Sequence, residues 1–263
     1  MKKLLAIMLA AVMVFSFAAC GTETTTTTDN AESDLQYIQD KGTLIVGITD
    51  YEPMNYEDAN GEWTGFDTEF ALAVAEKLGV KAEFIEIEWD SKIMELDSKS
   101  IDCVWNGMTL TDEVKKGMNC SNPYVVNAQV VVAPSDKIGE YKTVDDLADV
   151  KFVAEAGSAG EAAIKDAGYE ATAVSTQADA LLEVASGSAD ACVIDITMAN
   201  AMTGEGTSYA NLKSGISLTS EEYGIGFRKG SDVTAKVNEI IEELKADGTL
   251  PALAEKYKLT LAD

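Results

Sequence analysis

Short apolar runs alternate with amphipathic segments along most of the chain. Residues 43–48 form a run rich in β-branched side chains, which is typical of a buried strand. Residues 67–78 place Phe70, Val74 and Leu78 four positions apart, on one face of a helix. Strands that alternate with helices predict βαβ units and a largely parallel sheet.

The same alternation predicts two series of elements. The first adds strands at residues 81–87, 101–105 and 129–133. The second predicts strands at 152–155, 171–174 and 191–195, with helices at 160–166 and 177–186. A last helix carries an apolar stripe and ends at Asp247-Gly248; the stripe consists of Val233, Val237, Ile240, Ile241 and Leu244. Two α/β series with a strand-rich join near residues 125–131 predict two lobes.

The N-terminus has the pattern of an export signal. Lys2 and Lys3 precede an apolar run at residues 4–17, which is too short to span a bilayer core of roughly 30 Å. The run ends in small residues followed by Cys20, which resembles a bacterial lipobox. A buried core helix would explain neither the paired lysines nor the small residues. We therefore expect a lipoprotein signal peptide at residues 1–20, acylation of Cys20 and a lipid anchor in the membrane.

A polar segment separates this signal from the folded body. Residues 21–34 contain a run of five threonines and almost no apolar side chain. Such a segment cannot bury enough surface to offset its ordering entropy, so it is expected to be a flexible tether. The remaining residues, about 230, suffice for a large core and fit two lobes better than one.

Composition excludes several classes of function. The formal charge is −25, and loss of Lys2 and Lys3 with the signal makes it −27, so the chain repels nucleic acid. The chain has no histidine, the commonest general base and metal ligand. Cys103 and Cys192 lie in apolar runs typical of buried thiols; with Cys120 they leave disulfide pairing open. No metal or cofactor is expected.

Polar residues follow several of the predicted strands. In open α/β sheets, ligands bind outside the carboxyl ends of the strands. Those ends fall at Asp50, Asn106, Gly157 and Asp195. The pattern predicts a ligand cleft along these ends.

Motifs at these strand ends resemble family 3 extracellular solute-binding proteins, which serve polar amino acid ABC importers. The matches run in order from about residue 44 to 257: GITDYEP at 47–53, GEWTGFD at 61–67, Ile101-Asp102 before NGMTLT at 106–111, SNPY at 121–124, Gly187 with Asp190-Ala191 and Asp195, and ADGT at 246–249. Any one match is weak, whereas the ordered set is specific.

The resemblance implies an α/β, two-lobed, type II periplasmic-binding-protein-like fold that closes on a ligand. Lobe 1 would comprise residues 35–127 and 222–263, and lobe 2 residues 128–221. The implied partners are a small-molecule ligand, an amino acid or related amine, and an ABC permease with its ATPase. The implied protein is an extracytoplasmic monomer that binds without catalysis.

The same resemblance assigns ligand contacts residue by residue. Tyr51 falls on an aromatic that packs on the ligand, and Trp89 on the opposite wall; together they could sandwich a planar or cationic group. The alternative for Trp89 is a core tryptophan. Asp50 falls where some members contact a distal amine, and a turn-capping role is equally open.

Polar ligand contacts are also implied. Asn106, Gly107 and Thr109 fall where the family holds a carboxylate, and the turn at Ser158 has amides that can donate to an anion. Asp195 falls on the acceptor for the α-ammonium. Its alternative role is the N-cap of a helix that starts at residue 196.

The sequence departs from the family at the charged groups. Val114 replaces the arginine that grips the ligand's α-carboxylate, and Lys115 and Lys116 follow it at offsets that point elsewhere on a helix. Glu155 occupies a usually apolar position in lobe 2. These changes predict a ligand of zero or positive net charge. The rival is that Asn106, Thr109 and the amides near Ser158 hold a carboxylate unaided.

Two other functions use the same features. A cleft enzyme on this fold would have to rely on a carboxylate such as Glu52, Glu155 or Asp195, and no paired acid and base is visible. A lipoprotein that presents its ligand to another receptor remains the second alternative.

Overall fold

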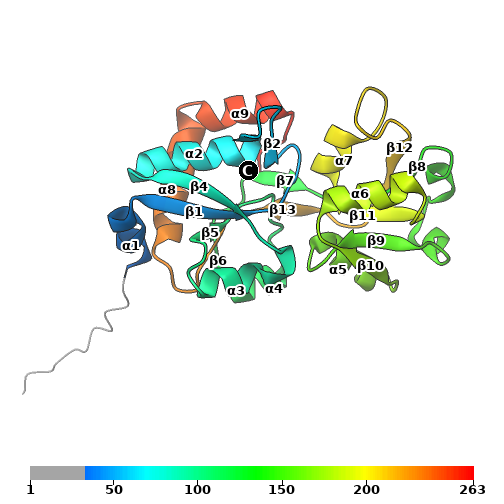
Figure 1. Ribbon diagram of the computed structural model, residues 1–263, viewed down its shortest axis with the longest axis horizontal. Helices are drawn as coiled ribbons and strands as arrows, with labels where there is room; N and C mark the ends of the chain where they lie inside the picture. The colour runs from blue at the N-terminus through cyan, green and yellow to red at the C-terminus, as the bar shows by residue number, and fades with distance from the viewer. Residues whose placement is uncertain (1–32) are drawn as a thin grey trace, which may run out of the picture. The chain divides into compact units, whose positions relative to one another are not determined.

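The computed structural model describes residues 33–263 (Figure 1). The predicted signal peptide, Cys20 and most of the predicted tether lie outside the described residues. Ser33 and Asp34, expected at the end of that tether, instead begin helix α1 (Asp34–Lys41). The Ser33 side chain accepts a hydrogen bond from the Gln36 amide, which is a standard N-cap.

The first sheet has the strand order β4-β1-β5-β14-β6. Its strands are β4 (Lys81–Glu86), β1 (Thr43–Ile48), β5 (Cys103–Val104), β14 (Gly226–Phe227) and β6 (Asn119–Cys120). β1 pairs in parallel with β4 and β5, whereas β14 pairs antiparallel with β5 and β6. One strand therefore runs against the other four.

The second sheet repeats this arrangement in the order β10-β9-β11-β8-β12. Its strands are β10 (Ala171–Val174), β9 (Phe152–Glu155), β11 (Ala191–Asp195), β8 (Gln129–Pro134) and β12 (Leu212–Ser217). β8 is antiparallel to both β11 and β12, and the other pairs are parallel. Each sheet is thus mainly parallel, and its reversed strand is the first to enter after the chain crosses from the other sheet.

The chain crosses between the sheets at β7 (Val125–Asn127) and β13 (Glu221–Tyr223), which pair antiparallel (Figure 1). The strands of the second sheet all lie between residues 129 and 217, inside the range expected for lobe 2. The fold is the predicted two-lobed α/β fold, and we call the two sheets with their helices lobe 1 and lobe 2.

Helices cover both sheets. In Figure 1, one face of the first sheet carries α2, α8 and α9, and the other carries α3 and α4. Lobe 1 contains α2 (Phe66–Leu78), α3 (Lys92–Asp97), α4 (Asp112–Gly117), α8 (Val233–Ala246), α9 (Thr249–Tyr257), the 3₁₀ helix η1 (Trp89–Ser91) and the hairpin β2 (Tyr56–Glu57) with β3 (Trp63–Thr64). Lobe 2 contains α5 (Ala159–Asp166), α6 (Gln177–Ser186), α7 (Ile196–Met202), η2 (Ile138–Glu140) and η3 (Val144–Leu147).

The core of lobe 1 is aromatic where α2 meets the sheet. Phe70 packs edge-on against Trp105, with ring centroids 4.8 Å apart, and also against Tyr124. All three side chains are completely buried. The GFD motif lies at the start of this helix, with Gly65 as the N-cap at φ +118°. A Cβ at this position would lie 2.3 Å from the Met54 carbonyl oxygen, so the position requires glycine.

The apolar pattern predicted most of the strands and helices with close bounds, including the edge strand β10, and it missed one strand of the second sheet. The predicted strands at 43–48, 152–155, 171–174 and 191–195 and the helix at 177–186 have the observed bounds. The strand expected at 101–105 is shorter, spanning two residues. β12 was missed because it is a largely exposed edge strand with an irregular register, and its sequence LKSGIS lacks an apolar signal.

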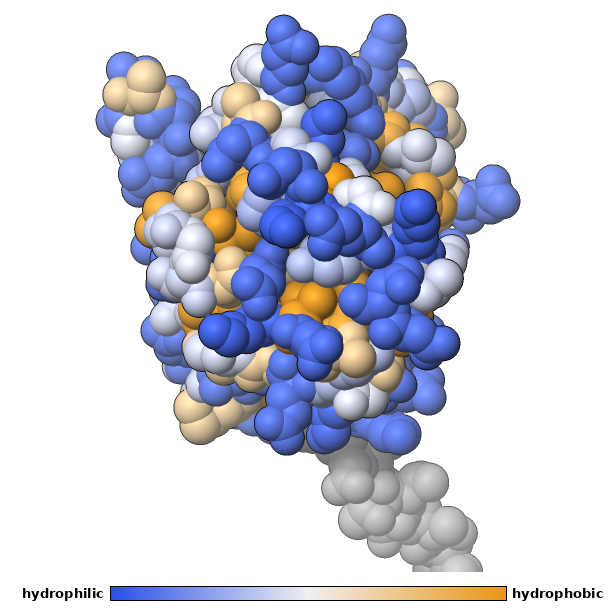
Figure 2. All heavy atoms as spheres, turned by 90° about the vertical axis from the view of Figure 1, so that its right-hand side faces the viewer, coloured by the Kyte–Doolittle hydropathy of each residue, from blue (hydrophilic) through white to orange (hydrophobic). Residues whose placement is uncertain are grey.

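The surface at the end of lobe 2 is largely hydrophilic. Figure 2 shows the end of lobe 2, where hydrophilic side chains surround a few scattered apolar ones. Within residues 33–263, no helix has both the length and the apolarity that a membrane span requires. In the same range, Cys103, Cys120 and Cys192 are all free thiols, and burial raises the pKa of Cys103.

The chain contains one arginine, Arg228, and lobe 1 uses it structurally. Its guanidinium is buried and donates to Asp34 (3.0 Å), to the Ile101 carbonyl (2.7 Å) and to Asp102 (3.4 Å). Asp102 also pairs with Lys41 at 2.6 Å. This cluster ties α1 and β14 to the start of β5.

Candidate ligand-binding site

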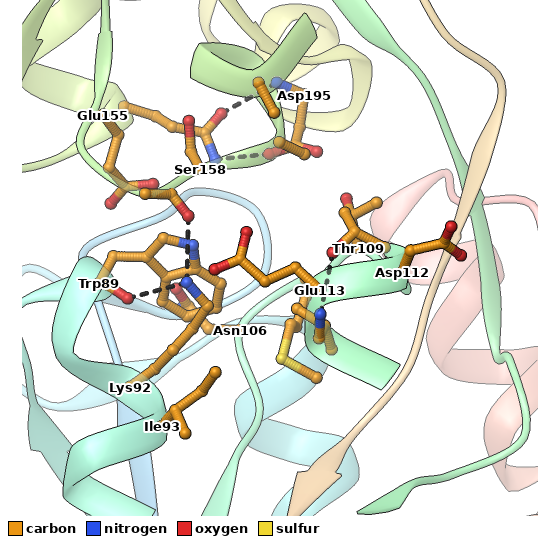
Figure 3. A pocket seen from close by; sticks show the side chains of 18 of the residues that line it. Trp89, Lys92, Ile93, Asn106, Thr109, Asp112, Glu113, Glu155, Ser158 and Asp195 are labelled. Carbon is orange, nitrogen blue, oxygen red and sulfur yellow. Dashed lines mark hydrogen bonds between the residues drawn. The ribbon is translucent and has the colours of Figure 1, made fainter. Parts of the chain in front are cut away.

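A cavity of about 370 Å³ lies where strand ends from both lobes meet (Figure 3). Lobe 1 contributes η1, α3, the turn after β5 and the start of α4, and lobe 2 contributes the ends of β9 and β11 and the start of α5. Seven of the nine predicted ligand contacts line it: Trp89, Asn106, Gly107, Thr109, Glu155, Ser158 and Asp195. The structure thus brings together residues that are up to 106 positions apart in the sequence.

Tyr51 is not among the lining residues. Its side chain is 1% exposed, and its hydroxyl bonds to the hydroxyls of Thr197 and Tyr223. It packs behind Gly107, where a Cβ would lie 2.6 Å from the tyrosine ring. The expected Tyr51–Trp89 sandwich is therefore not formed here, because Tyr51 supports the Gly107 turn and links it to lobe 2.

Asp50 lines a separate cavity, together with Glu52, Glu86 and Trp63. Burial raises the pKa of Asp50, and the neighbouring Glu86 carboxylate raises it further. The structure does not bring Asp50 to the same wall as Asp195.

Trp89 belongs to the core of lobe 1 and also lines the cavity. It is 7% exposed and packs in an apolar cluster with Leu96 and Val114, and its side chain also lines the cavity. The Lys92 ammonium lies 4.8 Å from its ring centroid. The face that was expected to hold a ligand cation is thus already in contact with a lysine.

Lys92 lines the cavity and was not among the predicted ligand contacts. It is 8% exposed, and its ammonium donates to the carbonyls of Trp89 and Gly157, at 3.0 Å each (Figure 3). Gly157 belongs to lobe 2, so this lysine spans the two lobes. The available signal was weak, since only Lys92 and Leu96 of this short helix are buried and Met94 is exposed.

The Asn106-Gly107 turn is held in place from lobe 1. The Gly107 amide donates to the Asp67 carboxylate at 2.6 Å, and this carboxylate also accepts from the Tyr124 hydroxyl. Burial raises the pKa of Asp67 to about 7, against these hydrogen bonds. The Asn106 amide bonds to Thr49 through its oxygen (2.7 Å) and its nitrogen (2.9 Å).

Asp195 is the centre of a buried amide network. It accepts hydrogen bonds from the side-chain amides of Asn127, Gln129 and Gln177. Burial raises its pKa to about 7, and the nearby Glu221 carboxylate adds to this shift. A carboxylate has about four acceptor positions, so three internal donors leave room for one more.

The alternative of a helix cap fails for Asp195. The residue occupies the N-cap position of α7, but its side chain makes no capping hydrogen bond. The carboxylate turns toward the amide network and the cavity instead.

Glu155 ends β9 and points at the same cavity (Figure 3). It is 2% exposed, and its Oε1 has no hydrogen-bond partner among the described residues. Burial raises the pKa of Glu155 to about 8; Asp195 adds to the shift and Lys92 opposes it. With this pKa the carboxyl group is mostly protonated at pH 7 without a ligand, and a cationic ligand in the cavity would favour its ionised form.

The turn at Ser158 is less available to an anion than expected. The Gly157 amide donates to Glu161 at 2.8 Å, and the Ser158 amide donates to the Glu155 carbonyl at 3.2 Å. The Ser158 hydroxyl accepts from the Glu161 amide as the N-cap of α5. These amides are already used inside lobe 2.

Val114 lies where the family's arginine was expected. It is 5% exposed and lines the cavity as part of the apolar cluster. Lys115 and Lys116 are exposed and are not among the lining residues. Lys92 is the one cation in the lining, against five carboxylates: Asp112, Glu113, Glu155, Asp166 and Asp195.

Two α/β lobes joined by paired crossings, with a polar cavity between their strand ends, define a bilobed binding protein. The family model of bacterial extracellular solute-binding proteins, family 3, matches residues 44–260. The chain belongs to this family, as its motifs predicted.

Three similar proteins show the range within the family. The L-cystine-binding protein TcyJ of Escherichia coli (strain K12) is 32% identical over 230 residues, which cover 86% of each chain. The arginine-binding extracellular protein ArtP of Bacillus subtilis (strain 168) is 30% identical and covers 98% of each chain. The crystal structure of AncCDT-1, an ancestral amino acid-binding protein and precursor of cyclohexadienyl dehydratase, is 36% identical with a TM-score of 0.78, over 86% of this chain and 99% of that one.

Proposed function

We propose that this protein is the substrate-binding component of an ABC importer, and that it captures a small amine-bearing molecule, an amino acid or related amine, between its lobes. The observation that carries this proposal is the pair of buried carboxylates, Asp195 and Glu155, in one cavity wall. A protonated amine would neutralise them, and the apolar face of Trp89 would pack on the rest of the ligand. Cystine and arginine, named for two relatives, both carry amines.

The charge of the cavity sets an expectation for the ligand. A carboxylate buried without a compensating cation is costly, and five acidic residues face the space. Ligands with zero or positive net charge fit this wall, and acidic amino acids should be the weakest. A thermal-shift panel of amino acids, amines and small peptides tests this ranking. Stabilisation by glutamate or aspartate above all others would contradict it.

The ammonium site makes a direct prediction. Asp195→Asn keeps the shape of the side chain and removes its charge, so affinity for an amine should fall about ten- to a hundredfold. Calorimetry with the amino acid that stabilises the protein most in the panel measures this. Asp149→Asn, at an exposed position of lobe 2, is the matched control and should bind normally. Unchanged affinity in Asp195→Asn would mean that Asp195 only accepts hydrogen bonds from its amide network and does not bind the ligand.

The proposal extends to anchoring and partners. Acylation of Cys20 would hold the protein as a monomer at the extracytoplasmic face of the membrane, where it would deliver its ligand to a permease whose ATPase acts on the cytoplasmic side. Its family description is extracellular, in keeping with export.

Cys20→Ser should release the protein into the soluble fraction and leave ligand binding intact. The physical reason is that several acyl chains anchor stably, whereas a protein without them has no apolar attachment. Membrane fractionation with an antibody measures this. A wild-type protein found soluble and cleaved at another residue would contradict the lipid anchor.

We also propose binding without turnover, because the relatives are binding proteins. The alternative is catalysis in the cavity, because the chain is similar to a dehydratase precursor and because carboxyl groups with raised pKa values can serve as acids near neutral pH. Mass spectrometry after incubation with each stabilising compound should recover it unchanged. Accumulation of a product would favour the enzyme instead.

A further inference from the structure

The cavity holds one buried cation whose charge is not balanced by an ion pair. Lys92 is 8% exposed, and none of the ion pairs among residues 33–263 includes it. Its two hydrogen bonds go to neutral carbonyls. An ammonium has three donors, so one proton remains for a ligand in the cavity.

The carboxylates around Lys92 do not provide that balance. Burial lowers the pKa of Lys92, and Glu155, Glu113 and Asp90 only partly oppose this shift. Glu113 and Asp90 are exposed, so solvent screens them. Glu155 is buried opposite the lysine and forms no ion pair with it. A buried lysine from lobe 1 and a buried carboxyl group from lobe 2 therefore face one cavity.

The other candidate donors for a ligand carboxylate are occupied within the protein. The Asn106 amide nitrogen donates to the Thr49 carbonyl at 2.9 Å. The Thr109 hydroxyl donates to Glu221 at 2.8 Å. The amides of Gly157 and Ser158 are used within lobe 2, as described above. The chain's arginine is buried with Asp34 and Asp102, which leaves Lys92 as the charged donor of the cavity.

We propose that Lys92 binds the carboxylate of the ligand in place of the missing arginine, and that the ligand is a zwitterion whose ammonium meets Glu155 and Asp195. This inference rests on the proposed function and adds the ligand class and a specificity-determining residue. A zwitterion offers a carboxylate to Lys92 and an ammonium to the carboxyl groups of Glu155 and Asp195, so it uses both walls of the cavity, whereas an amine alone uses one. Because Lys92 also donates to Gly157 of lobe 2, carboxylate binding and lobe closure involve the same ammonium.

The test uses the standard amino acids, each paired with its carboxamide and its decarboxylated amine, titrated by calorimetry into the unaltered protein and into Lys92→Met. In the unaltered protein, a compound that binds should do so at least tenfold more tightly as the free acid than as the amide. In Lys92→Met this ratio should fall to about one, while the amide itself binds nearly as before. The double comparison isolates the coupling between the lysine and the carboxylate.

Two further variants separate this role from a structural one. Lys116→Met, an exposed lysine near Val114, should keep the full acid-to-amide ratio. Lys92→Arg retains a cation and should keep most of the ratio even where Lys92→Met folds poorly. An unchanged ratio in Lys92→Met would overturn the inference. Binding of the amines alone would overturn it and leave the proposed function standing, whereas binding of no compound would contradict both.

Discussion

Glu155→Gln should make the ligand-free protein more stable at pH 9, by on the order of 3 kcal/mol, although it weakens ligand binding. Burial raises the pKa of Glu155 to about 8, from an ordinary value of 4.5. A group whose pKa is raised by folding stabilises the protein below its ordinary pKa. That stabilisation is lost progressively as pH rises from the ordinary pKa to the pKa in the folded protein. The glutamine has no charge to bury, so the variant avoids this loss.

Denaturant unfolding at pH 5 and pH 9 measures the effect. At pH 5 the side chain at position 155 is neutral in the folded state of both proteins. The variant should therefore match the unaltered protein or be slightly less stable. At pH 9 the variant should be the more stable of the two. Glu170→Gln, at an exposed position of lobe 2, should change nothing at either pH. A variant that loses stability equally at both pH values would mean that Glu155 is well paired in the folded state.

Arg228→Met should destabilise lobe 1 by about 3–5 kcal/mol, the typical effect of removing one partner from a buried ion pair. The substitution leaves Asp34 and Asp102 without their shared cation and removes the donor to the Ile101 carbonyl. Methionine fills much of the same volume, so the loss reports the charge rather than a void.

Denaturant unfolding of Arg228→Met at pH 7 measures this loss. Affinity should stay within about twofold under conditions where the variant is folded, because Arg228 does not line the cavity. Lys213→Met, at an exposed position, is the matched control. A change below 1 kcal/mol would show that this cluster contributes only as a surface ion pair does.

The buried part of the fold could be predicted from the sequence because burial imposes periodicity. Residues 152–154 and 191–194 are continuous apolar runs, each followed by an acidic residue, and the structure buries every residue of both strands. β12 carries no such pattern because it lies at the sheet edge. The direction of β8 was not predictable from periodicity, since it depends on where the chain crosses between the lobes.

The site was predictable as a set of strand ends, but not as a set of contacts. The strand ends that carry Asn106, Glu155 and Asp195 lie around one cavity. The motifs could not show that Tyr51 turns its hydroxyl toward Thr197, because that depends on packing between the lobes. Lys92 could not be predicted from the sequence, because the fold brings its ammonium to the carbonyl of Gly157, which lies 65 positions away.

Recognition of an amine by the acidic wall is the central claim, and one calorimetric comparison tests it most directly. The amino acid that stabilises the protein most is titrated beside its N-acetyl derivative, which lacks the positive charge. The derivative should bind at least a hundredfold more weakly, because Asp195 and Glu155 then have no cation to neutralise them. Equal affinity for the two compounds would contradict the account.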